Sequence, residues 1–224
     1  MTHLDLELKQ LRSDIIEMWN LVITQLYKSQ EAFERFDKDL AHEVNSNEKR
    51  VDAFELKVSM DCENILALLN PVANDLRFVL AVLAINFDLE RIGDYARSIA
   101  KIVAESKSEF SKDSIEKSKI PDMYAVAIKM LTDTLEAFEK EDNLKVRTVF
   151  KRDDELDKVN KNANEIVAAL IKQYPNDVIN HLNLLSIIRK LERMGDQTKA
   201  IAEEIIFYIE AKVLRHKKKK EKLQ

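Results

Sequence analysis

The sequence contains few residues that break helices or cross-link chains. Its 224 residues include only two glycines, three prolines and one cysteine. Because β-rich folds need many more glycines and prolines at their turns, this composition argues against a sandwich or barrel and predicts an all-α protein with long helices. The single Cys62 cannot form an intrachain disulfide. We therefore expect a buried thiol in a reducing compartment.

Long apolar runs are also missing. The longest one, at residues 78–85, is much shorter than the roughly 20 residues that a membrane-spanning helix needs. The first ten residues, MTHLDLELKQ, are charged and lack the apolar centre of a secretory signal. We expect a cytoplasmic protein that meets a membrane only through its partners.

Motifs of common enzymes are absent. Two glycines, both in helical patterns, leave no room for a glycine-rich phosphate loop, so ATP hydrolysis is excluded. The sequence has no GxSxG motif and no cluster of cysteine and histidine, so it gives no signal of nucleophilic catalysis. We predict a protein that is not an enzyme.

Charge is divided unevenly along the chain. The formal net charge is −4, but the last stretch, KVLRHKKKKEKLQ (212–224), contains seven cations and one acid. The preceding body is therefore acidic. A basic end of this kind is typical of a solvated helix terminus, and it can also contact acidic proteins, anionic lipid or nucleic acid. We expect no nucleic-acid binding.

The chain contains an internal repeat, marked by LERIGD at 89–94 and LERMGD at 191–196. We predict a first repeat at 1–107, a serine- and lysine-rich linker at 108–121, and a second repeat at 122–224. Three landmarks recur in the same order: Glu48 and Asp153 lie 105 positions apart, Pro71 and Pro175 lie 104 apart, and Glu90 and Glu192 lie 102 apart.

Each repeat is predicted to form three helices, giving six long antiparallel helices in two tandem three-helix bundles. The predicted helix ends are as follows: Asp37 and Asp39 cap a helix that runs to about Leu69, Asn70 and Pro71 open the next one to about Lys107, Asp142 opens the fifth, and the sixth runs from about 176 to 214.

Four pairs of acids, spaced four residues apart, fall at equivalent places in the repeats. At about 100° per residue, each pair lies on the flank or outer face of its helix, away from the apolar stripe. Two adjacent helices could bring four carboxylates into one surface depression per repeat, which suits hard cations such as Mg²⁺, Mn²⁺, Ca²⁺ and iron. The pairs are Glu48 and Asp52, Glu90 and Asp94, Asp153 and Asp157, and Glu192 and Asp196.

Both glycines stand beside these acids, inside helices, where glycine costs about 1 kcal/mol relative to alanine. Gly93 and Gly195 lie between the acidic and apolar stripes, so a missing side chain would let a neighbouring helix or a hydrated ion approach. The alternative is a solvated charged face, because Arg97, Lys161 and Lys199 follow the acids at helical spacing.

Two other functional classes compete with a metal-binding regulator. A carboxylate-bridged di-iron enzyme needs inward-facing glutamates and Glu-x-x-His pairs, and no histidine here has a glutamate three residues before it. A helical scaffold without metal would need an exposed partner surface. The first helix offers one candidate stripe for it: Trp19, Val22, Ile23, Leu26 and Tyr27.

The repeated motifs resemble those of a known family. The stretches NPVANDLR (70–77), DLERIGDYARSIA (88–100) and KLERMGDQTKAIAEE (190–204) are similar to the signature of the PhoU family of phosphate-signalling regulators. The resemblance covers nearly the whole chain and implies tandem three-helix repeats. It also implies a regulator, with repression when phosphate is plentiful, whose partners are the ATPase of a phosphate ABC transporter and a sensor histidine kinase, and a possible homodimer.

The resemblance also implies surface metal clusters held by E/D-xxx-D motifs. Iron is the metal it favours, with zinc, manganese or magnesium as alternatives. The sequence departs from the family pattern at two places, which argues against equal metal occupancy of the two sites. Asn47 stands where an acid might be expected, and YPNDVINH (174–181) has no counterpart of Asp75-x-Arg77. The implied ligands are Glu48, Asp52, Glu90 and Asp94 in the first repeat, and Asp153, Asp157, Glu192 and Asp196 in the second.

Overall fold

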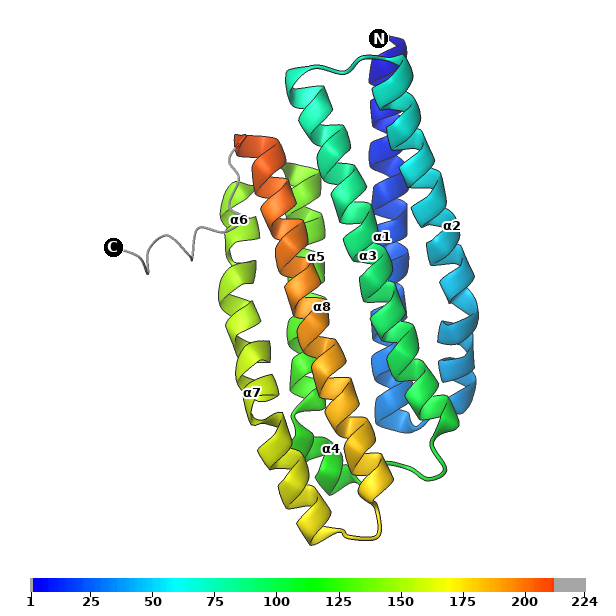
Figure 1. Cartoon of the computed structure of the whole chain (residues 1–224), viewed down its shortest axis with the longest axis vertical. Helices are drawn as coiled ribbons and strands as arrows, with labels where there is room; N and C mark the ends of the chain where they lie inside the picture. Colours follow the sequence, from blue (N-terminus) through cyan, green and yellow to red (C-terminus); the bar gives the residue numbers. More distant parts are fainter. Residues whose placement is uncertain (1, 212–224) are drawn as a thin grey trace, which may run out of the picture.

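The computed structural model describes residues 2–211, and within that range it is an all-α protein without β-strands. The helices run up and down along the long axis of the molecule (Figure 1). The predicted fold class is confirmed. The helices are α1 (His3–Arg35), α2 (Lys38–Leu68), α3 (Ala73–Glu105), α4 (Lys112–Ser118), α5 (Ile120–Lys140), α6 (Asn143–Arg147), α7 (Val149–Gln173) and α8 (Val178–Glu210).

Two groups of three long helices pack against each other. Helices α1, α2 and α3 form one group, and α5, α7 and α8 form the other. The groups meet where α3 packs on α8 and α1 packs on α5, and Figure 1 shows α3 and α8 side by side. Because buried apolar residues from both groups belong to one cluster, the repeats share a continuous core.

The aromatic stripe of α1 lies largely in this shared core. Trp19 is fully buried, its indole N–H donates to the Leu131 carbonyl of α5 (3.2 Å), and its ring centroid lies 5.7 Å from that of Phe138. Val22 and Leu26 are also buried. The stripe therefore joins the repeats and is not a partner surface, although Tyr27 at its edge is exposed.

A second connection between the repeats is the guanidinium of Arg12 on α1. It lies 4.8 Å from the ring centroid of Phe78 on α3 and 5.1 Å from that of Phe138 on α5. The same group donates to the Tyr208 hydroxyl of α8 (2.9 Å). The attraction between a cation and an aromatic ring is stronger where water is partly excluded, so these rings stabilise the position of the guanidinium. Arg12 thus fixes four helices from two repeats.

The turn between α2 and α3 differs from the prediction. Asp37 does cap α2, accepting from the Leu40 N–H (2.9 Å). Asn70, however, adopts a left-handed conformation with φ 46°, and α3 begins only at Ala73, after Val72. Asparagine tolerates this conformation better than most residues, so Asn70 continues the turn after α2 instead of starting the next helix.

The predicted linker contains a helix. Ser111 caps α4, because its Oγ accepts from the Ser114 N–H (3.1 Å). Phe110 is buried, and its ring centroid lies 5.2 Å from that of Phe33. The serine- and lysine-rich composition of the segment gave no indication that Phe110 anchors it to α1. The next helix, α5, starts within the same segment, at Ile120.

The predicted fifth helix is split. Asp142 does start a helix, accepting from the Leu144 and Lys145 N–H groups, but this is the short α6. The chain turns at Thr148, whose hydroxyl and N–H both donate to the Lys145 carbonyl. The final helix, α8, is described to Glu210, so the last predicted residues of that helix and the basic tail lie outside the described residues.

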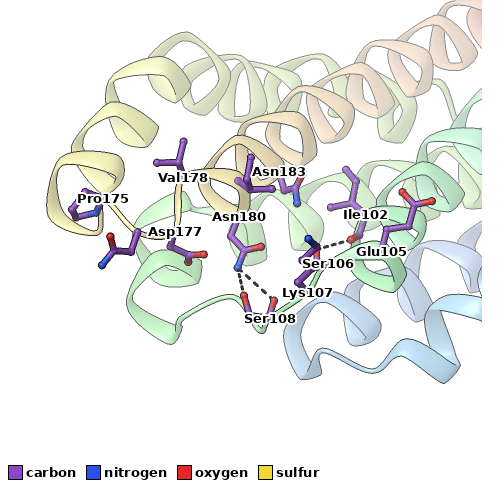
Figure 2. A pocket seen from close by; sticks show the side chains of 12 residues that line it. Ile102, Glu105, Ser106, Lys107, Ser108, Pro175, Asp177, Val178, Asn180 and Asn183 are labelled. Atoms are coloured by element: carbon purple, nitrogen blue, oxygen red, sulfur yellow. Dashed lines mark hydrogen bonds between the residues drawn. The ribbon is translucent and has the colours of Figure 1, made fainter.

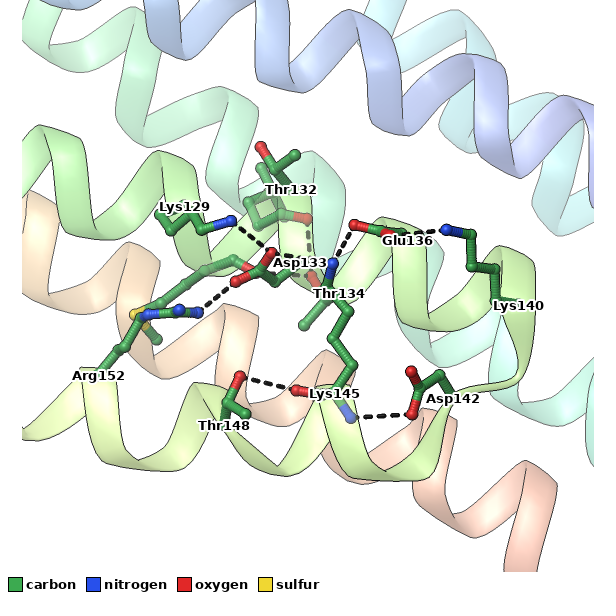
Figure 3. A network of polar contacts seen from close by, with 12 residues as sticks. Lys129, Thr132, Asp133, Thr134, Glu136, Lys140, Asp142, Lys145, Thr148 and Arg152 are labelled. Atoms are coloured by element: carbon green, nitrogen blue, oxygen red, sulfur yellow. Dashed lines mark hydrogen bonds and ion pairs between the residues drawn. The ribbon is translucent and has the colours of Figure 1, made fainter.

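A buried acid holds this split region together. Asp133 on α5 is buried and pairs with Lys129 (2.8 Å), Lys145 (3.4 Å) and Arg152. The cations come from α5, α6 and α7, and they converge on one carboxylate (Figure 3). Among residues 2–211, no helix has both the length and the apolar character of a membrane span.

Candidate metal centre

The first-repeat acids lie where α2 and α3 run antiparallel. The register of this pair is fixed by the buried Asn86 on α3, whose amide donates to the Glu55 carbonyl (2.9 Å) and the Ser59 hydroxyl (3.0 Å) of α2. Continuing along both helices from this point brings Glu48 and Asp52 of α2 beside Glu90 and Asp94 of α3.

Electrostatic coupling shows that these four acids share one environment. Burial, followed by the charges of Asp94 and Asp52, raises the pKa of Glu90 to about 7. Burial and a hydrogen bond with Asp94 raise the pKa of Glu48, against the lowering effect of Arg97. A carboxylate whose pKa is raised by its neighbours is poised to exchange its proton for a cation.

A cation from α3 already bridges part of this cluster. The Arg97 guanidinium pairs with Glu48 on α2 and lies 3.5 Å from Asp94 on its own helix. Sequence spacing suggested only the intrahelical contact with Asp94. The bridge to Glu48 depends on the register of two helices, which spacing within one helix does not reveal.

The second repeat has the same arrangement on α7 and α8. Lys199 pairs with Asp153 of α7 and with Asp196 on its own helix (2.7 Å). Burial, and then the charges of Asp196, Asp157 and Asp153, raise the pKa of Glu192. All four predicted acids of this repeat therefore influence one another.

Asp153 departs from the expected position on an outer face, because it is only 4% exposed. Burial raises its pKa, and the hydrogen bond from Lys199 opposes that effect. Its Oδ1 is buried without a hydrogen-bond partner. A buried carboxylate oxygen without a partner is costly, and a bound cation would satisfy it.

Gly195 allows this burial. A Cβ on Gly195 would lie 2.5 Å from Leu156 Cδ1 and 3.0 Å from Asp153 Oδ1. In the first repeat a Cβ on Gly93 would meet Val51 Cγ1 at 3.3 Å. Both glycines therefore serve the close approach of the neighbouring helix, which is one of the two roles considered for them.

The acids of each repeat are electrostatically coupled but are not grouped as a set of metal ligands. Among residues 2–211, no three His, Cys, Asp or Glu side chains are grouped so that they could hold a metal ion. The bridging Arg97 and Lys199 give a physical reason, since each draws two acids toward itself. Binding of a metal by these residues would require that cation to move aside.

Two residues near the acids were missed by the sequence analysis. Glu55 on α2 contributes to the raised pKa of Glu90, and Asn160 on α7 hydrogen-bonds with Glu192, which lowers the pKa of that acid. Each lies three residues after a predicted acid on the same helix. A spacing of three residues between acids would have found Glu55, whereas Asn160 would also have required counting amides as partners.

A cavity of about 690 Å³ lies elsewhere, between the end of α3 and the start of α8 (Figure 2). The buried Asn180 amide donates there to the Ser108 hydroxyl (3.1 Å). None of the eight predicted acids lines this cavity. The acidic centres are surface clusters between paired helices, so they differ in kind from an enclosed ligand pocket.

Known proteins are similar to this chain over most of its length. A relative from Thermotoga maritima, named phosphate-specific transport system accessory protein PhoU homolog 1, is 31% identical over 208 residues, which is 92% of this chain and 88% of that protein. A Burkholderia protein named phosphate-specific transport system accessory protein PhoU homolog is 30% identical, covering 95% of this chain and 91% of its own length.

Solved structures agree with the fold. The crystal structure of the phosphate transport system regulatory protein PhoU from Streptococcus pneumoniae superposes with a TM-score of 0.85 at 26% identity, covering 95% of this chain and 99% of that one. PhoU from Pseudomonas aeruginosa gives 0.84 at 27% identity, covering 93% and 99%.

The family model described as PhoU domain matches the chain twice, at residues 15–103 and 120–205. These two matches contain the two bridged acid clusters and account for most of the chain. The chain therefore belongs to the PhoU family.

Proposed function

We propose that this chain is a non-enzymatic accessory protein that regulates phosphate uptake. The observation that carries the proposal is its full-length likeness to relatives named as accessory proteins of phosphate-specific transport systems. The likeness extends over both repeats of this chain and over 88% and 91% of the two relatives' lengths. Its partners in this proposal are the ATPase of a phosphate ABC transporter and a sensor histidine kinase.

The regulatory role is testable in cells that lack the gene for this chain. The measurements are phosphate uptake and a phosphate-responsive reporter, each in high and low phosphate. We expect the reporter to become active in high phosphate when the gene is absent, and to be repressed again when the full chain is restored. If reporter activity and the phosphate uptake rate are the same with and without the gene, the proposal is contradicted.

Metal binding through the eight acids is a second part of the proposal. It is supported by the electrostatic coupling among the four acids of each repeat, the raised pKa of Glu90 and the unpartnered Oδ1 of buried Asp153. Glu48, Asp52, Glu90 and Asp94 would hold metal in the first repeat, and Asp153, Asp157, Glu192 and Asp196 in the second. Iron is the proposed metal, with manganese, zinc and magnesium as alternatives. An all-carboxylate set favours hard cations.

Elemental analysis after loading with each metal and desalting tests this part. The variant Asp94→Ala with Asp196→Ala should lose bound metal while its circular dichroism stays helical. The matched control replaces the exposed acids Glu116 and Glu165, which lie outside the clusters, with glutamine. Equal metal content in both variants would remove the assignment and leave the regulatory role untouched.

A further inference from the structure

Large apolar side chains gather on the outer surface of the first repeat. Leu76, Leu80 and Phe87 on α3 are 37%, 42% and 44% exposed, and Leu56 and Met60 on α2 are 68% and 59% exposed. We call these five residues the apolar face. Single exposed leucines are ordinary, but a contiguous group on one surface marks an interaction site.

The register of α2 and α3 makes the apolar face continuous. Asn86 on α3 bonds to Glu55 and Ser59 of α2, and each of these three residues is followed directly by a member of the face. On α3, the half-buried Leu83 completes the spacing of four, three and four residues from Leu76 to Phe87. Residues at this spacing share one side of a helix.

The second repeat reproduces this surface only in part, because Leu76 and Leu80 correspond to Val178 and Leu182 but the other three members correspond to charged residues. Applying the same offsets as for the acid pairs, Phe87 corresponds to Arg189, Leu56 to Lys161 and Met60 to Glu165. All three charged residues are at least partly exposed. The fold alone therefore does not require apolar residues at these three positions, because the equivalent helices of the same molecule use charged ones there.

Acids border the apolar face at one end. Asp52 follows it on α2, and Glu90 and Asp94 follow it on α3, beyond Phe87. One more acid, the exposed Glu63, lies at the opposite end of the face, three residues after Met60 on α2. Arg97 offsets part of the acid cluster through Glu48 and Asp94. Arg91, four residues after Phe87, lies 3.8 Å from Asp88, and the exposed Lys49 lies three residues before Asp52. Five acids (residues 48, 52, 88, 90 and 94) therefore stand against three cations, and the end beside Phe87 keeps a negative excess.

We propose that the apolar face binds an amphipathic helix of a partner protein, one that carries an apolar stripe ending in lysine or arginine. Two antiparallel helices form a shallow groove, and helix-in-groove binding uses apolar anchors at this spacing. The face spans about three helical turns, or roughly 17 Å, which matches a short helix. The basic end of that helix would meet Asp52 and Glu90.

The charges disfavour two other occupants. A second copy of this chain would bring the same surplus of acids to this face, and an anionic membrane would be repelled by that surplus. The inference rests on the regulatory proposal and deepens it by giving the chemistry of a partner. Its five apolar anchors are not proposed metal ligands, but Asp52 and Glu90 at its acidic end are. It is tested in the presence of chelator, so its outcome does not depend on metal or phosphate.

The probe is a designed, fluorescein-labelled helical peptide with leucines spaced four, three and four residues apart and three terminal lysines. Anisotropy titration with the full-length chain gives its affinity. The double variant Leu56→Ser with Phe87→Ser should weaken binding at least tenfold. The matched control Leu182→Ser, an exposed leucine at the second-repeat position of Leu80, should change it less than twofold. Both variants should keep the wild-type melting temperature within a few degrees.

A peptide with glutamates in place of the lysines should bind at least tenfold more weakly. Equal binding of the two peptides, or binding unaffected by the double variant, would overturn the proposal. It would also be overturned by sedimentation showing a dimer that only the double variant dissociates, which would make the occupant a second copy. Binding to phosphatidylglycerol vesicles that the double variant abolishes would make it a membrane.

Discussion

Arg97 and Lys199 occupy the same position in the two repeats, and each bridges two acids on adjacent helices. Arg97 joins Glu48 and Asp94, and Lys199 joins Asp153 and Asp196. The repeats differ in the identity of the cation and of one acid but keep the bridge. Each acid cluster therefore carries its own internal cation, which a metal ion would have to displace.

Replacing Arg97 with glutamine should strengthen metal binding by the first repeat. Loss of the guanidinium frees Glu48 and Asp94 and removes about 1 kcal/mol of repulsion toward an incoming cation, or roughly fivefold in affinity. Calorimetric titration with Mn²⁺ measures the change. Lys101→Gln is the matched control, because Lys101 is an exposed cation on the same helix that pairs with Glu105 (3.8 Å). Affinity unchanged by Arg97→Gln would show that the guanidinium and the metal do not compete.

Glu90 should make the metal-free protein less stable as pH rises. Its pKa is about 7 in the folded state against an ordinary value of 4.5. Between these values the folded state holds a proton that the unfolded state has lost, so the free energy of unfolding falls as pH rises from about 4.5 to 7. Urea unfolding at pH 5 and pH 7.5 measures this loss.

Glu90→Gln should reduce that pH-dependent loss by about 1–2 kcal/mol after solvent screening is allowed for. Glu139→Gln, an exposed acid outside the clusters, serves as the control. If Glu90→Gln and wild type lose stability equally over this range, Glu90 is not the titrating group.

The two motif glycines should respond differently to alanine. Each substitution gains about 1 kcal/mol in helix propensity. At Gly195 the new Cβ would meet buried Leu156 at 2.5 Å, and overpacking a core costs about 1–3 kcal/mol. At Gly93 the nearest atom lies at 3.3 Å. We expect Gly195→Ala to lower the melting temperature and Gly93→Ala to leave it unchanged or slightly higher, and the reverse order would refute the packing explanation.

Asp133→Asn should destabilise the second repeat. Burial opposes the charge of Asp133, but hydrogen bonds from Lys129 and Arg152 outweigh it and hold its pKa below the ordinary value of 3.8. Its stabilisation is present above pH 3.8 and is lost as pH falls through the lower folded value. Removing the charge leaves three cations without their shared partner, costing about 2 kcal/mol at pH 7.

Denaturant unfolding at pH 7 measures that cost. Asp122→Asn is the matched control, because Asp122 is an exposed acid on the same helix, 3.9 Å from Lys119. If Asp133→Asn lowers the free energy of unfolding no more than the control does, the contacts of Asp133 with its three cations add nothing to stability.

Much of the fold was predictable because helix signals are local. The scarcity of glycine and proline, the apolar periodicity and the cap at Asp37 predicted long helices, and the repeated motif predicted which helices are equivalent. The errors came where a single residue acts through distant contacts. Phe110 anchors α4 on Phe33, far away in sequence, and the composition of the linker gave no sign of it.

The acid clusters were predictable only in part. Spacing placed each pair on one helix face, and the repeat placed the pairs on neighbouring helices. The burial of Asp153 and the bridges of Arg97 and Lys199 depend on how closely two helices approach, and that distance is set by Gly195 and Leu156 in one repeat and by Gly93 and Val51 in the other. The sequence shows where the glycines are, but it does not show how closely they allow the two helices to approach.

The contacts of Trp19 and Arg12 have a consequence for how such a protein can arise and be divided. Both side chains of the first repeat complete their bonding only with residues of the second, including the Leu131 carbonyl and the Tyr208 hydroxyl. A half-length chain would expose the indole and the apolar flanks of α1 and α3 to water. A single-repeat ancestor would have needed to pair with a twin, and separating the halves by protease or by gene splitting should yield fragments that are soluble only when they are produced together.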